Sequence, residues 1–147
     1  MGMFGEFLKR LTQPDPEPLV DEDARLALAA LLVRVARADG HYSADEAEQI
    51  VDILAKRYGL AATASKALRE QAEVLEAEAP DTVRFTRAIK DAVPHEDRES
   101  VIEALWTIVL SDGQRDAKEN ATLRLVANLL GVNDRDSNIA RQRVDRG

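Results

Sequence analysis

The sequence predicts an all-α protein, and three features of the chain favour this fold class. Aromatic residues, which favour strands, make up only 4% of the chain. No segment alternates between apolar and polar residues for long enough to form a β-strand. Gly40, Gly59, Gly113 and Gly131 each stand where an apolar helical pattern stops, as glycines that end helices in a left-handed conformation do. We therefore expect a compact helical bundle of about seven to eight helices.

The chain starts with a short amphipathic segment and a proline-rich linker. The first predicted helix places four apolar residues on one face, namely Phe4, Phe7, Leu8 and Leu11. We assign residues 1–20 to this segment with its linker, and residues 21–147 to a single helical domain. In chain order, the expected helices cover approximately residues 3–12, 21–38, 43–58, 62–78, 81–92, 95–111, 116–130 and 134–144.

Two of these helices are apolar on nearly every side, which is typical of a helix at the centre of its domain. They contain residues 26–36 and 101–110. The single tryptophan, Trp106, belongs to the second of them, and we expect it in the core. The other helices carry one-sided apolar stripes and should pack around this central pair.

The same short pattern follows both central helices and predicts an internal repeat. An Asp-Gly pair ends each helix, and a glutamate follows the glycine after five residues. At an offset of 73 residues, the corresponding positions are Asp39 with Asp112, Ser43 with Asp116, and Glu46 with Glu119. We interpret the domain as two helix–turn–helix units with equivalent acidic turns, joined by residues 61–94.

Helix capping explains these turns without any ligand. Ser43 and Asp116 each precede a glutamate by three residues, which is the spacing of a capping box. In that arrangement the cap side chain and the glutamate satisfy backbone N–H groups of the first helical turn. The carboxylates would then serve local structure alone.

The spacing also matches the second half of an EF-hand calcium loop, where an oxygen ligand, a glycine and a closing glutamate follow one another. The first half is missing from both copies, so neither turn forms a calcium loop by itself. Two facing half-loops would still offer oxygen ligands to a hard cation, which we expect to be calcium, magnesium or manganese. The candidate ligands are Asp39, Glu46, Asp112, Asp116 and Glu119.

The doubled pattern in ARADGHYSADEAEQIVDIL and VLSDGQRDAKENATLRLVANLLGV resembles the tellurite-resistance protein TerB and its wider domain superfamily. The resemblance covers roughly residues 24–133. It implies a small all-helical bundle with an acidic face that binds metal and a link to tellurite and stress responses. The resemblance implicates Asp39, Glu46, Asp112 and Glu119 in metal binding. The first copy has Ser43 at the position where the second copy has Asp116, so the two half-sites are chemically different.

Composition limits the classes of function. A net charge of −7 disfavours nucleic acid as a partner, because such binding needs a basic surface. The chain has no cysteine and no cofactor-binding motif, so it lacks the thiols or redox group that tellurite reduction requires. No apolar run is long enough to span a membrane, and we expect a cytoplasmic protein without an organic cofactor.

Three functions remain open from the sequence. The first is a non-enzymatic module whose acidic turns bind a divalent cation or a protein partner. The second is a metal-dependent hydrolase that uses the same carboxylates, although no general base or substrate-positioning group is evident. The third is a purely structural interaction module. We expect a protein partner or a homo-oligomer, with weak peripheral membrane contact through the N-terminal segment as an alternative.

Overall fold

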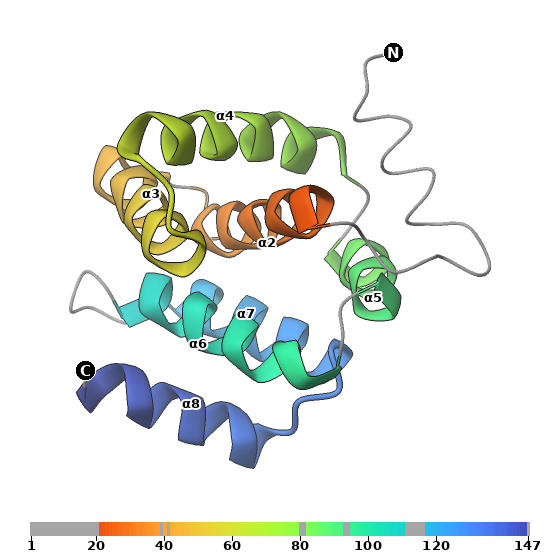
Figure 1. The fold of residues 1–147 in the computed structure, drawn as a ribbon. Helices are drawn as coiled ribbons and strands as arrows, with labels where there is room; N and C mark the ends of the chain where they lie inside the picture. Colours follow the sequence, from red (N-terminus) through yellow and green to blue (C-terminus); the bar gives the residue numbers. More distant parts are fainter. Residues whose placement is uncertain are drawn as a thin grey trace.

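The computed structural model describes residues 21–38, 40, 42–79, 82–92, 95–110 and 117–146. Within this part of the chain every regular element is an α-helix, so the predicted all-α fold class is confirmed (Figure 1). The helices are α2 (Asp21–Ala36), α3 (Ala44–Tyr58), α4 (Ala62–Glu78), α5 (Thr82–Ala92), α6 (His95–Leu110), α7 (Ala117–Leu129) and α8 (Asp134–Arg146). The predicted helix at residues 3–12 and the linker after it lie outside the described residues.

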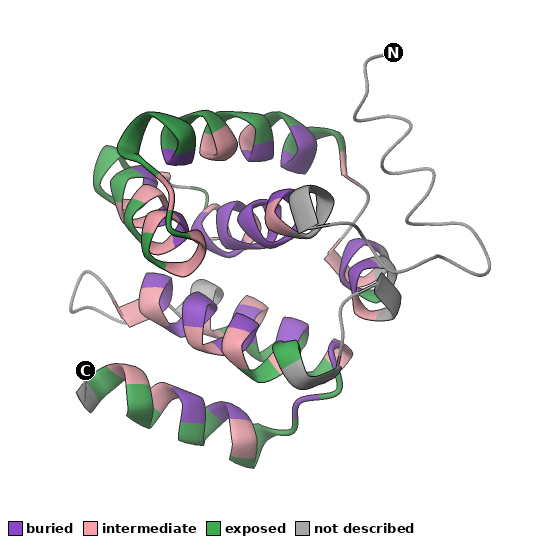
Figure 2. Ribbon diagram, viewed as in Figure 1, coloured by how far each residue is buried: buried purple, intermediate pink, exposed green. Residues whose placement is uncertain are grey.

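The two helices predicted to be central lie in the middle of the bundle. Every residue of α2 from Leu26 to Ala36 is buried except Arg34, and α6 buries most of residues 101–109. Figure 2 shows the buried residues running along most of α2. The two helices contact each other, and α3, α4, α5, α7 and α8 surround them. A helix with apolar residues on every side is stabilised by such a position because each side loses contact with water.

The outer helices bury one stripe each. α3 packs against α2, α4 and α6 through a stripe that includes Ile50 and Leu54. α4 packs on α2 with Ala72 and Leu75 inward, and its outer side is exposed in Figure 2. α8 packs on α6 and α7 at the other side of the bundle.

Local sequence signals mark several of the helix ends. Gly40, Gly59 and Gly131 have φ angles of +83°, +63° and +81°, as expected for glycines at the ends of helices. Gly113, predicted to behave in the same way, lies outside the described residues. α3 begins with the predicted capping box: Ser43 is the N-cap and Glu46 closes it.

Trp106 is buried on α6, as predicted, and its indole reaches the last helix. The Nε1–H group donates a hydrogen bond to Oγ of Ser137 on α8, at 3.1 Å. Because Ser137 is also buried, this contact satisfies two polar groups that water does not reach. It ties α8 to the centre of the bundle. No helix of the described chain is both long and apolar enough to cross a bilayer.

Candidate functional site

The structure places only part of the predicted ligand set. Asp39, Asp112 and Asp116 lie outside the described residues, and Glu119 is described only as part of the backbone of α7. Glu46, at the start of α3, is described in full. The described residues contain no cluster of three histidine, aspartate or glutamate side chains suited to a metal. Convergence of the five carboxylates therefore stays a prediction.

Glu46 has a capping role. Its Oε1 atom accepts hydrogen bonds from the backbone N–H of Ser43 at 3.4 Å and from the Ser43 hydroxyl at 3.3 Å. In return, the backbone N–H of Glu46 donates to the Ser43 hydroxyl at 3.0 Å. These contacts hold the chain after the first acidic turn in one conformation, and they fix where the Glu46 carboxylate sits.

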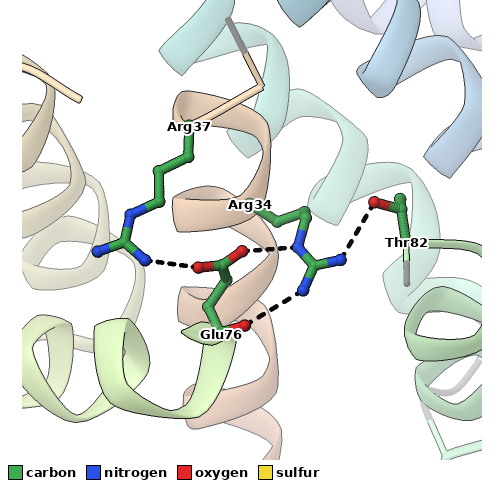
Figure 3. A network of polar contacts seen from close by, with 4 residues as sticks. All are labelled: Arg34, Arg37, Glu76 and Thr82. Carbon is green, nitrogen blue, oxygen red and sulfur yellow. Dashed lines mark hydrogen bonds and ion pairs between the residues drawn. The ribbon is translucent and has the colours of Figure 1, made fainter. Parts of the chain in front are cut away.

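Two arginines hold the chain before the first acidic turn (Figure 3). Arg34 donates from Nε to Oε1 of Glu76 on α4 at 2.7 Å, and Arg37 donates from Nη1 to Oε2 of the same carboxylate at 2.6 Å. Arg34 also donates to the backbone carbonyl of Glu76 and to the hydroxyl of Thr82 on α5, both at 3.2 Å. We call Arg34, Arg37, Glu76 and Thr82 the Glu76 network.

The Glu76 network lies largely out of water. The Glu76 side chain is only 11% exposed and the Arg34 side chain 15%. A carboxylate at such a position requires compensation of its charge, and two guanidinium groups provide it. The end of α2 is thereby fixed to α4 and to the start of α5, immediately before the Asp-Gly pair.

Tyr42 holds the other side of the same turn. The Arg37 guanidinium lies 5.1 Å from the centre of the Tyr42 ring, a distance that permits cation–π attraction. Burial of the phenol, and then the nearby Glu73 carboxylate of α4, raise the pKa of Tyr42 well above its ordinary value. The phenol therefore stays neutral at physiological pH. Arg37 and Tyr42, which stand on the two sides of the first acidic turn, thus contact each other.

The second acidic turn lacks the same anchor. At an offset of 73 residues, Thr107 stands where the first copy has Arg34, and Leu110 where it has Arg37. Yet the helices that lead into the two turns are arranged alike. α2 and α6 contact each other, both run from right to left in Figure 1, and their carboxyl ends lie on the same side of the molecule.

Sequence reasoning missed Glu76. It is one of four glutamates in α4, and 42 residues separate it from Arg34. The one available signal was Arg34 itself, the only charged residue in an otherwise apolar stretch from Leu26 to Ala36. A charge at a central position of a buried helix requires a partner, although its identity depends on the fold.

Residues 25–142 match the protein family described as tellurite resistance protein TerB. The match covers most of the chain and includes both acidic turns and every helix from α3 to α7 in full. Among curated proteins and solved structures, no significant match to this chain is found.

Proposed function

The chain belongs to the tellurite-resistance TerB family, and we propose that it is a non-enzymatic helical module that binds one divalent cation between its two acidic turns. In this proposal the cation-loaded surface is what a protein partner of the stress response recognises. The module acts in the cytoplasm, by binding rather than by chemistry on tellurite, since the chain offers no thiol.

The arrangement of α2 and α6 is the observation that carries this proposal. The two helices are in contact and end on the same side of the bundle (Figure 1). An Asp-Gly pair begins three positions after the last residue of α2 and two positions after the last residue of α6, so both acidic turns follow the helix ends on that side. The carboxyl end of a helix carries a partial negative charge, and two such ends favour a cation.

The donor set fits a hard cation. Asp39, Glu46, Asp112, Asp116 and Glu119 supply carboxylate oxygens, which calcium, magnesium and manganese prefer. The Glu76 network and the contact between Arg37 and Tyr42 support the proposal further, because they restrain the described residues on either side of the first acidic turn without any ion. A site whose ligands are already positioned loses less conformational entropy on binding.

Calorimetric titration of calcium, magnesium and manganese into metal-stripped protein tests the proposal. We expect binding that is lost in the Asp39→Asn/Asp112→Asn variant. The matched control is Asp52→Asn/Asp145→Asn, which changes the net charge equally at two exposed aspartates of α3 and α8. Equal losses in both variants would show that only overall charge matters, and this would contradict a defined site.

The capping box favours a second function, a purely structural interaction module. Glu46 already satisfies backbone groups at the start of α3, and such a role needs no ion. The same titration separates the two functions. If millimolar ion produces neither heat nor thermal stabilisation, the acidic turns are helix caps and the cation proposal is wrong.

A further inference from the structure

A groove of about 750 Å³ lies between α7 and α8, away from the Glu76 network. Trp106 of α6 lines it, together with Ala121 and Leu125 of α7 and a stripe of polar residues from each of the two helices. On α7 the stripe runs from Asn120 through Arg124 to Asn128, which lie on one helical face. On α8 it includes Asn138 and Arg141.

The groove is cationic on an anionic protein. Among the residues that the structure describes, its charged side chains are Arg124, Arg141 and Asp134, which gives a local net charge of +1 where the whole chain carries −7. At physiological ionic strength, charges beyond about 8 Å are largely screened, so a ligand in the groove responds mainly to the local arginines. This local field favours a carboxylate.

Arg141 is the residue best placed to receive that carboxylate. Its guanidinium lies 5.9 Å from the centre of the Trp106 ring. Its buried Nε atom has no hydrogen-bond partner in the part of the chain that the structure describes. Arg141 forms no ion pair with an acidic side chain of the described residues, so a ligand carboxylate at the exposed part of this half-buried side chain meets no competing acid.

The length of the groove and its asparagine side chains indicate how long the ligand is and which groups it presents. From Asn120 to Asn128 the α7 stripe extends about 12 Å, at 1.5 Å per residue of helix. Extended chain covers that distance in about four residues, at roughly 3.3 Å each. The side chains of Asn120, Asn128 and Asn138 carry both donors and acceptors, which match the N–H and C=O groups of an extended backbone.

We propose that this groove binds a short, extended, acidic segment of a partner protein, with one of its carboxylates on Arg141. The proposal is independent of cation binding, since it uses none of the acidic turn residues. Arg124 is already held by Asp134, at 2.8 Å and 3.4 Å between nitrogen and oxygen atoms. Asp134 therefore competes with the acidic segment for Arg124.

This competition gives the test two variants with opposite expected effects. Arg141→Gln removes the receiving cation and should weaken binding about tenfold, the loss expected for one charge-assisted hydrogen bond. Asp134→Asn removes the competitor and should strengthen binding several-fold. Because loss of stability does not produce tighter binding, the second variant separates recognition from damage to the fold.

The ligand probe is acetylated tetraglutamate amide, compared with tetraglutamine and tetralysine peptides of the same design. Trp106 is the only tryptophan of the chain, so its fluorescence reports occupation of this groove. Tetraglutamate should shift the emission, with an affinity that falls as salt rises. The matched controls on α8 are Arg143→Gln, whose guanidinium pairs with Glu103, and Asp145→Asn.

We expect both control variants to bind tetraglutamate like the unmodified chain. The proposal is overturned if tetraglutamate and tetraglutamine act alike, or if millimolar tetraglutamate leaves the emission unchanged. It is also overturned if Arg141→Gln behaves like Arg143→Gln, or if Asp134→Asn gives no tighter binding than Asp145→Asn.

Discussion

Replacement of Glu76 by glutamine tests how much the Glu76 network contributes to the stability of the bundle. Glutamine keeps the shape of the side chain and removes its charge, which leaves the guanidinium groups of Arg34 and Arg37 without the carboxylate between them. Arg34 then remains largely buried without this carboxylate, and its positive charge and that of Arg37 repel each other. The variant should therefore be clearly less stable.

The size of the effect follows from burial. Loss of one partner from a buried ion pair costs about 3–5 kcal/mol. The Arg37 side chain is 35% exposed, so water screens that half of the network, and we expect about 2–3 kcal/mol in total. For a chain of 147 residues, 1 kcal/mol corresponds to about 3 °C in Tm. Glu76→Gln should lower Tm by about 6–9 °C.

Thermal unfolding followed by circular dichroism measures this shift, and Glu70→Gln is the matched control on the same helix. The Glu70 side chain is 58% exposed and lies 3.8 Å from Arg69, so its loss should cost less than about 0.5 kcal/mol. Equal Tm changes in the two variants would refute the reasoning. So would a Glu76→Gln variant as stable as the unmodified protein.

Three further substitutions test separate parts of the account. Ser137→Ala leaves the buried Trp106 N–H without an acceptor. The variant should lose about 1–3 kcal/mol of unfolding free energy in urea and show a shifted Trp106 emission. Unchanged stability and emission would contradict the contact. Gly59→Ala should lower the unfolding free energy by about 1–2 kcal/mol, because a φ of +63° strains an L residue. No atom lies near the added methyl group, so this backbone strain is the whole effect. An equally stable variant would contradict the conformation. Folding raises the pKa of Tyr42, so the phenol ionises at lower pH in the unfolded chain than in the folded one. Its contribution to the free energy of unfolding is therefore complete below pH 10 and is lost progressively as the pH rises above 10. Tyr42→Phe should therefore flatten the fall in Tm above pH 10, and an unaltered fall would show that another group causes it.

The helices could be predicted from the sequence because their signals are local. The expected range 62–78 is the observed α4, and the expected ranges for α3, α5 and α6 differ from the observed ones by single residues. Gly59 and Ser43 act where the sequence placed them, at the end and the start of α3. Apolar period, cap residues and positive-φ glycines all act within one or two helical turns.

Contacts between distant segments could not be predicted in the same way. Glu76 meets Arg34, and Ser137 meets Trp106, only because α4 and α8 pack on the two central helices. In the sequence, neither Glu76 nor Ser137 differs from its polar neighbours. Their roles depend on which helix face turns inward and on which helix covers it, and these are properties of the whole bundle.

The predicted ligand set stands between these two cases. Its spacing is a local signal, and at Ser43 and Glu46 the structure confirms the capping box that the same spacing predicts. Convergence of the two turns is a long-range property. The contact between α2 and α6 favours it, since each turn follows the carboxyl end of one of these helices.

Anomalous diffraction from crystals grown with manganese tests the central proposal most directly. A single cation held between the two turns predicts one strong manganese peak, with carboxylate oxygens from both turns within about 2.6 Å of it. The residues around that peak should include Asp39 and Asp112. A peak bound by one turn alone, or no peak at either turn, would contradict the proposal.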